Sequence, residues 1–376
     1  MTHGRPGRQS RGAPPRSRGP LEESLATAVS PAPKRMPADL DRQPIVVAWE
    51  TTRACPYRCA HCRADARPLP QPGQLDEAEA LDLVDGLDAF EGSILVLTGG
   101  DPLLRPDLEQ IVSRARSRGL RVALTPAATP RVTEERLASL QRAGMGQVAL
   151  SVDGANAASH DGLRALPGSF DRTLRILGRA RGLGFPLQVN TTVTRRNAGE
   201  IDAMARLVAG VGAAVWSVFF LVPTGRGRRS DLLSPHGHER AWRQLARIWG
   251  TTPFRIKVTA APPFRRVLAQ SGRAAAADAG QANDAKGFMF ISHDGEVCPS
   301  GFLPLSAGNV RHHSPVDLYR DSPLFRSLRD PARLRGRCGA CEYAAVCGGS
   351  RARAYALSGD PLGEDPTCIH RPEATC

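Results

Sequence analysis

Two kinds of periodicity alternate along the chain from residue 44 onward. Short apolar or β-branched runs, typical of buried strands, are separated by stretches whose apolar residues recur at helical spacing. The strand-like runs are PIVVAWE (44–50), SILVLTGG (93–100), RVALTP (121–126), QVALSVDG (147–154), PLQVNTTV (186–193) and VWSVFFLVP (215–223). Because strands that alternate with helices indicate parallel α/β packing, the six runs predict a partial (β/α)6 barrel similar to a TIM barrel. Functional sites on such barrels lie at the carboxyl ends of the strands.

The pattern divides the chain into four regions. Residues 1–43 are rich in Arg, Pro, Gly and Ser and hold few large apolar side chains, which predicts a disordered basic tail. The barrel core is expected over 44–233, followed by a linker with helical character over 234–286. From 287 to 376 the chain is turn-rich and carries cysteines, which predicts a small second domain.

Composition excludes several function classes. The net charge of +13 comes from the tail and from arginines scattered along helix-like stretches, and such arginines are typical of solvated faces. Aromatic and basic residues are not interleaved in a patch, so we expect no nucleic-acid partner. The chain has neither an apolar run of 18 residues nor an apolar N-terminal signal core, so we expect no membrane span and a cytoplasmic location. Nine cysteines in such a chain indicate metal or redox chemistry rather than disulfides.

Three closely spaced cysteines follow the first predicted strand. Cys55, Cys59 and Cys62 stand in WETTRACPYRCAHC with the spacing C-x3-C-x2-C. Three thiolates can hold three irons of a cubic iron–sulfur cluster and leave the fourth iron open to a small molecule. Zinc is the alternative, but structural zinc takes four ligands, and His61 is poorly placed to share a metal with the adjacent Cys62. The spacing favours the open cluster.

This spacing and its context resemble the radical S-adenosylmethionine (SAM) superfamily, whose hallmark is C-x3-C-x-Φ-C with Φ usually aromatic. Here Φ is His61. The resemblance implies a [4Fe–4S] cluster that binds SAM. When reduced, the cluster cleaves SAM to methionine and a 5′-deoxyadenosyl radical, which takes a hydrogen atom from the substrate. It also implies an electron donor such as flavodoxin or ferredoxin.

A glycine pair follows the second predicted strand, in TGGDPLLRPD. Gly99 and Gly100 allow the backbone to approach a ligand closely. Asp101 stands where the superfamily usually has a glutamate that binds the SAM amino group, and its side chain has a shorter reach. Without the cysteine loop, the same residues would indicate an ordinary turn.

Further SAM contacts are implied by resemblance at the ends of later strands. Ser151 and Arg164 resemble residues that contact the carboxylate or ribose of SAM, and Asn190 resembles a ribose contact. A surface ion pair is the alternative for Arg164. The segment LVPTGRG (221–227) resembles the part that passes the adenine, and a plain loop is its alternative.

Four cysteines near the C-terminus read C-x2-C-x5-C-x20-C and are Cys338, Cys341, Cys347 and Cys368. Four thiolates can close a second iron–sulfur cluster or bind zinc. This stretch resembles the SPASM/twitch extensions of the radical SAM superfamily, which implies one auxiliary [4Fe–4S] cluster.

The C-terminal region departs from the full SPASM pattern, which supports two auxiliary clusters. Arg351 occupies the place of the last cysteine in the usual C-x2-C-x5-C-x3-C. Cys298 is the only cysteine in the first half, where Ser300 and His313 fall on expected ligand positions. We therefore expect no second auxiliary cluster. Cys298 reads as a buried small residue or a pocket thiol, and Cys376 as a free, mobile one.

The substrate class rests on resemblance as well. AWETTRACPYRCAHCRA, ISHDGEVCPSGFLPL and CGGSRARAYALSGDPL look like a SPASM subgroup of enzymes that modify tetrapyrrole side chains and of maturases of ribosomal peptides. Residues 1–43 are too short and polar for the winged-helix domain that many peptide maturases carry, which favours a small molecule such as a tetrapyrrole. A peptide substrate is the alternative. An RNA-modifying enzyme and a non-catalytic zinc module are the hypotheses from other classes. Candidate partners for tetrapyrrole carboxylates are Arg226, Arg265, Arg266 and Arg351.

Overall fold

The computed structural model describes Met1 and residues 39–273 and 282–373. Most of the predicted tail therefore lies outside the described residues, as does Cys376. Residues Asp39–Cys376 make up one compact unit. No helix in the described part of the chain is long and apolar enough to cross a membrane.

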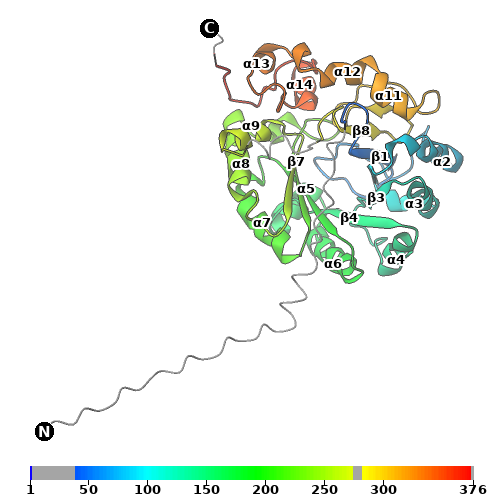
Figure 1. Ribbon diagram of the computed structural model, residues 1–376. Coiled ribbons are helices and arrows are strands. Elements are labelled where there is room, and N and C mark those ends of the chain that lie inside the picture. Colours follow the sequence, from blue (N-terminus) through cyan, green and yellow to red (C-terminus); the bar gives the residue numbers. More distant parts are fainter. Residues whose placement is uncertain (2–38, 274–281, 374–376) are drawn as a thin grey trace. The chain divides into compact units, whose positions relative to one another are not determined.

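A parallel, curled sheet forms the centre of this unit (Figure 1). Its first seven strands, in chain order, are β1 (Val46–Thr52), β2 (Ile94–Gly99), β3 (Arg121–Leu124), β4 (Met145–Ser151), β5 (Leu187–Val193), β6 (Val215–Phe220) and β7 (Arg255–Thr259). Each pairs with the next in parallel, so the spatial order follows the sequence. The predicted partial barrel is confirmed.

Two further strands extend the sheet beyond β1. The short strand β8 (Phe288–Ile291) pairs with β1 in parallel, and β9 (Val297–Cys298) pairs with β8 in antiparallel fashion. The sheet therefore draws strands from regions that the sequence had placed outside the barrel core. These are β7 in the predicted linker and β8 and β9 in the predicted second domain.

Helices cover the outer face of the sheet (Figure 1). They are α2 (Glu77–Asp85), α3 (Leu108–Ser117), α4 (Glu134–Arg142), α5 (Ala157–Arg164), α6 (Ser169–Gly182), α7 (Ile201–Gly210), α8 (Pro235–Ile248) and α9 (Pro263–Gln270). The local sequence explains their starts: Asp76 and Glu79 form a capping box on α2, for example. Apolar residues of these helices, α5 excepted, join the core against the sheet, and Trp49, Trp216 and Trp242 lie fully buried in this core.

The C-terminal region adds short helices along one end of the unit (Figure 1). They are α11 (Pro315–Asp321), α12 (Pro323–Arg329), α13 (Gly336–Gly339) and α14 (Arg351–Ser358). Contacts with the barrel hold them in place. The Tyr319 hydroxyl donates to Leu40 O and accepts from Gly287 N, and Arg353 Nη1 donates to Ala260 O at 2.9 Å. The cysteine-bearing region therefore packs directly on the barrel, next to the start of β8 and the end of β7.

Candidate active site

A cavity of about 220 Å³ opens at the carboxyl ends of the strands. This is where parallel α/β sheets place ligands. The predicted site residues that line it are Cys55, Cys59, His61, Cys62, Gly99, Gly100, Ser151, Arg164 and Asn190. They come from the ends of β1, β2, β4 and β5 and from α5. The structure therefore brings together residues that lie up to about 135 positions apart in the chain, from Cys55 to Asn190.

The three cysteines stand on a loop that main-chain hydrogen bonds close at its base. The loop leaves β1, whose register with β2 shifts between Glu50 and Thr52. Cys55 N donates to Arg67 O at 2.7 Å, and Arg67 N donates to Arg53 O at 3.0 Å. The loop thus begins and ends at one place, and the three thiols are held within it facing the cavity.

The segment after β6 clamps this loop. Arg226 N donates to Cys62 O, and its Nε donates to Cys59 O, both at 2.9 Å. Its Nη1 reaches Asp65 Oδ1 at 3.1 Å and Ala66 O at 3.0 Å. Gly225 has a φ of +57°, and a Cβ there would lie 2.2 Å from Arg63 O. The glycine and the arginine of the predicted adenine segment thus hold the cysteine loop.

Hydrogen-bond donors and a positive charge surround the cysteine sulfurs. Tyr57 N lies 3.4 Å from Cys55 Sγ, and Arg164 Nη1 lies 3.8 Å from Cys59 Sγ. Burial raises the pKa of Cys55 to about 12, so its thiolate needs a cation such as iron. Donors and positive charge around buried sulfurs suit the negative charge of an iron–sulfur cluster. This environment fits a cluster bound through the three thiolates.

Asp153 connects the cavity wall to the cysteine loop. Its buried carboxylate lies 2.5 Å from Arg164 Nη2 and 3.3 Å from His61 Nε2, and it accepts from Thr192 N at 2.7 Å. Burial alone would raise its pKa, but Arg164 and His61 hold it well below its usual range. Two buried nitrogens in this group, His61 Nδ1 and Arg164 Nε, have no hydrogen-bond partner among the described residues. These two nitrogens are therefore available to form hydrogen bonds with a bound ligand.

Comparison with known proteins shows which family the chain belongs to. Residues 49–208 match the Radical SAM superfamily. An AdoMet-dependent heme synthase from Methanosarcina barkeri is 39% identical over 340 residues, which cover 88% of this chain and 97% of the relative. The chain belongs to the radical SAM superfamily. AdoMet is another abbreviation of SAM, so the predicted cofactor class agrees with the relative.

Other likenesses place this radical SAM enzyme among the SPASM-type members. The mycofactocin maturase MftC of Mycobacterium tuberculosis is 31% identical over 336 residues, which cover 87% of this chain and 83% of the maturase. Streptococcus suis SuiB, solved with bound S-adenosylmethionine, has the same fold with a TM-score of 0.66. Its sequence identity is 13%, and the match covers 88% of this chain and 78% of SuiB.

Asp101 lies outside the set that lines the cavity. Its carboxylate is buried, accepts from Thr129 Oγ1 at 2.9 Å and from Leu103 N at 3.3 Å, and caps a short helical turn. Burial raises its pKa. In this radical SAM enzyme the short aspartate side chain is therefore engaged by the protein itself.

The glycine pair before Asp101 relieves crowding inside the protein. Gly99 has a φ of +140°, and a Cβ on Gly100 would lie 2.1 Å from Ala54 O. Both glycines line the cavity, but the close approach they permit is between the end of β2 and the end of β1. Their predicted contact with SAM remains a prediction.

The four C-terminal cysteines line one small hollow beside α13 and α9. Main-chain donors point at two of the sulfurs: Gly349 N lies 3.4 Å from Cys347 Sγ, and Asp365 N lies 3.4 Å from Cys338 Sγ. Gly349 has a φ of +68°, and a Cβ there would lie 2.8 Å from Cys338 Sγ. Four thiols around one hollow, two of them with main-chain donors aimed at the sulfur, fit a metal centre of either predicted kind, an iron–sulfur cluster or zinc.

Cys298 lies apart from those four. It is buried on β9 and lines a separate hollow with Arg63 and Ser300, and burial raises its pKa to about 12. His313, the other position that the SPASM pattern would use, is exposed. The placement is consistent with the predicted small buried thiol.

Sequence reasoning missed Asp153 and the role of Arg226 on the cysteine loop. Asp153 stands in SVDG and Arg226 in LVPTGRG, each at or just beyond the end of a predicted strand. This position at a strand end was the signal in the sequence that could have marked them as site residues. Their partners are far away in the chain: Asp153 binds His61, and Arg226 binds Cys59. A position after a strand could have suggested a site residue, but not its partner.

Proposed function

We propose that Cys55, Cys59 and Cys62 hold a [4Fe–4S] cluster that binds SAM in the cavity at the carboxyl ends of the strands. When bound and reduced, the cluster supplies the 5′-deoxyadenosyl radical by cleaving SAM. The observation that carries the proposal is the placement of three cysteine thiols on one clamped loop at the wall of this cavity. A ferredoxin or flavodoxin would supply the electron.

The residues around the loop would position SAM. Arg164, whose Nε lacks a partner, suits the SAM carboxylate, and His61 suits a contact to the same molecule. Ser151 and Asn190 pair across β4 and β5 and line the cavity, which supports their predicted ribose contacts. Gly99 and Gly100 would provide main-chain contacts. Asp101 would reach the SAM amino group only if its hydrogen bonds were exchanged.

The substrate we propose is a tetrapyrrole that carries carboxylates. The heme synthase likeness, 39% over nearly the whole of both chains, supports this class. The cavity wall includes the aromatic rings of Phe219 and Phe302, which suit a flat, largely apolar molecule. The cavity therefore combines an aromatic wall with a place for SAM.

Among the predicted arginines, Arg265, Arg266 and Arg351 lie with the C-terminal region instead of the cavity. Arg265 donates to Val346 O, Arg266 pairs with Glu239, and Arg351 reaches Cys338. Arg226 lines the cavity, but it binds the cysteine loop. We propose a lysine, Lys257, as the partner for a substrate carboxylate.

Lys257 stands in one row with the cavity residues. Across four adjacent strands, Ser151 pairs with Asn190, Asn190 with Ser217, and Ser217 with Lys257. Residues in such a row point to the same face of the sheet, so Lys257 faces the barrel interior. It makes no hydrogen bond or ion pair with any described residue, and burial lowers its pKa to about 8. A half-buried cation that makes no ion pair with the described residues suits a carboxylate of the substrate.

We further propose that Cys338, Cys341, Cys347 and Cys368 hold one auxiliary [4Fe–4S] cluster. Their shared hollow and the donors aimed at the sulfurs support a closed four-thiolate site. Maturation of a peptide is the second candidate function, and the 31% identity with the maturase MftC favours it over the RNA-modifying and zinc-module alternatives.

Substrate assays with the reconstituted enzyme test the proposal. The enzyme, SAM and dithionite would be incubated anaerobically with an iron porphyrin bearing propionate side chains, and both 5′-deoxyadenosine and the porphyrin would be followed by mass spectrometry. We expect the porphyrin to lose mass in step with 5′-deoxyadenosine formation. SAM cleavage without any change to tetrapyrroles would reject this substrate class and favour the peptide candidate.

A further inference from the structure

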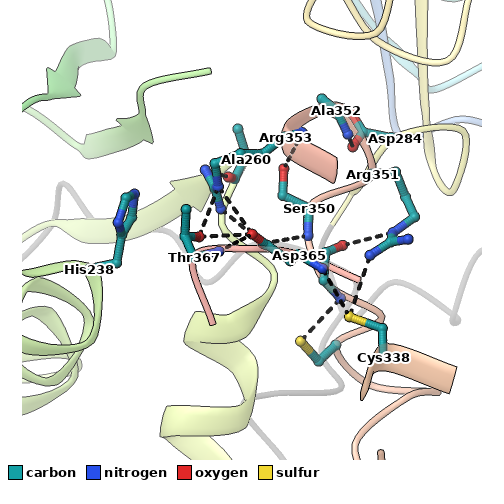
Figure 2. Close-up of polar contacts among 12 residues, drawn as sticks. His238, Ala260, Asp284, Cys338, Ser350, Arg351, Ala352, Arg353, Asp365 and Thr367 are labelled. Carbon is teal, nitrogen blue, oxygen red and sulfur yellow. Dashed lines mark hydrogen bonds and ion pairs between the residues drawn. The ribbon is translucent and has the colours of Figure 1, made fainter. Parts of the chain in front are cut away.

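Arg351 is a buried cation without a carboxylate partner. It begins α14, and only 2% of the residue is exposed. Its Nη1 donates to Pro361 O at 3.0 Å and Gly363 O at 2.6 Å, and its Nε donates to Gly349 O at 3.3 Å. Its Nη2 points to Cys338 Sγ at 3.6 Å (Figure 2). Within the described part of the chain, no carboxylate forms an ion pair with it.

The neighbouring arginines are neutralised by carboxylates. Arg353 pairs with Asp365 at 3.1 Å, and neither side chain is exposed (Figure 2). Arg337 pairs with Glu364 at 3.0 Å, and Arg266 pairs with Glu239. An unpaired buried charge is costly because it loses its hydration without gaining a counter-ion. Arg351 therefore stands out in a region where other arginines are paired.

Asp284 is a carboxyl group close enough to interact with the charge of Arg351. Burial raises the pKa of Asp284, which favours its uncharged form, and the nearby cations Arg351 and Arg353 only partly oppose this. Its Oδ2 accepts from Ala352 N at 3.0 Å instead of from the guanidinium. Asp284 is therefore a weak counter-ion, and Asp365, which also lies nearby, is already paired with Arg353. The charge of Arg351 is thus left for the Cys338 sulfur that its Nη2 reaches.

We propose that Arg351 is a positioning residue that raises the reduction potential of the auxiliary cluster through its charge and its hydrogen bond to Cys338 Sγ. This inference rests on the cluster assignment proposed above. A cluster held by four thiolates carries a net negative charge, and reduction by one electron increases it. A fixed cation and a donor at a ligand sulfur stabilise the more negative state, so they favour reduction.

The local geometry keeps the guanidinium in place. Three carbonyl groups hold Nε and Nη1, so Nη2 is left for the sulfur. Gly349 makes room, because a Cβ there would lie 2.6 Å from Arg351 Nη2 and 2.8 Å from Cys338 Sγ. The chain thus places a hydrogen-bond donor, instead of a further thiolate, at the position where the full SPASM pattern has a cysteine.

A redox titration tests this role. The full-length Cys55→Ala/Cys59→Ala/Cys62→Ala variant isolates the C-terminal site, and its midpoint potential would be measured by EPR with and without Arg351→Gln. We expect the equilibrium constant for reduction to fall about tenfold, which is about 59 mV for a one-electron couple. Arg335→Gln is the matched control, since Arg335 is 64% exposed and pairs with Asp360. It removes the same charge away from the sulfurs and should leave the potential unchanged.

A second variant separates charge from folding. Arg351→Lys keeps the charge and loses the fork of donors, so its potential should lie between those of wild type and Arg351→Gln. If Arg351→Gln loses the cluster, retention of it by Arg351→Lys would still support the counter-charge role. An intact cluster with an unchanged potential in Arg351→Gln would overturn this inference alone. Zinc in place of iron at the C-terminal site would overturn the inference together with the cluster assignment.

Discussion

Arg226 binds the cysteine loop through its main chain and its side chain together. Its contacts to Cys59 O, Cys62 O, Asp65 and Ala66 O span the loop from the second cysteine onward. Asp153 holds the opposite side through His61 and Arg164. At this scale the spacing of the cysteines in the sequence predicted the candidate ligands. It could not identify the residues that orient them, because hydrogen bonds between distant segments leave no spacing signature.

Arg226→Gln should loosen the cysteine loop. The loss of charge-assisted hydrogen bonds to carbonyl oxygens should destabilise the loop by about 2 kcal/mol. We expect the variant to release iron from the SAM site faster than wild type when a chelator is added, with its far-UV circular dichroism unchanged. Arg228→Gln, an exposed position two residues further on, is the control. Equal iron release from wild type and Arg226→Gln would contradict the assigned role.

Lys257→Met tests the proposed carboxylate partner. Loss of the charge should raise KM for a carboxylate-bearing tetrapyrrole about tenfold, and KM for SAM should change little. Because burial lowers the pKa of Lys257 to about 8, the wild-type KM should rise as pH increases through that value, whereas KM of the variant should stay flat. Arg206→Gln, at an exposed position on α7, is the control, because Arg255 on the same strand itself helps to lower the pKa of Lys257. A wild-type pH profile retained in Lys257→Met would argue against the assignment.

The elements around the site illustrate what periodicity can and cannot predict. Strands β1–β6 were predicted because they are continuous apolar or β-branched runs. The strand β7 was missed because RIKVT alternates: Ile256 and Val258 pack outward, whereas Lys257 faces the interior. The strand β8 has only four residues, FMFI, and joins the sheet through β1, whose paired residues stand 242 positions earlier, as Val46 does from Phe288. Pairing at this range is set by the tertiary fold.

Glu50, at the end of β1, connects several elements and should make stability depend on pH. It pairs with Arg53 at 2.8 Å and Arg63 at 2.7 Å, and His293, just beyond β8, lies 3.5 Å away. Burial alone would raise its pKa, but these partners lower it to about 2 from 4.5. Since the folded pKa lies below the unfolded one, the stabilisation is complete above pH 4.5 and is lost as pH falls toward 2.

Glu50→Gln should therefore lower the free energy of unfolding by about 3 kcal/mol at pH 6, and the difference from wild type should shrink in acid. Urea unfolding at pH 6 and pH 3.5, with both proteins at the same iron content, measures this. Glu91→Gln is a control at an exposed carboxylate just before β2. A difference between Glu50→Gln and wild type that is the same at both pH values would contradict the linkage.

The whole molecule joins two cysteine-bearing regions through one sheet and one buried network. The strands β8 and β9 continue the barrel sheet, and the buried pair of Arg353 and Asp365 links α14 to Ala260 at the end of β7. The cysteine-bearing C-terminal region is therefore built onto the barrel. The sequence predicted that two separate sets of cysteines carry chemistry. It did not predict that the two regions share one sheet, which the structure shows.

Metal and product analysis after anaerobic reconstitution tests the central claim most directly. Iron and zinc would be counted in wild type and in Cys55→Ala/Cys59→Ala/Cys62→Ala, and 5′-deoxyadenosine would be measured after addition of dithionite and SAM. The account predicts about eight irons in wild type, about four fewer in the variant, and 5′-deoxyadenosine from wild type alone. Equal iron in both proteins, or SAM cleavage that survives in the variant, would contradict it.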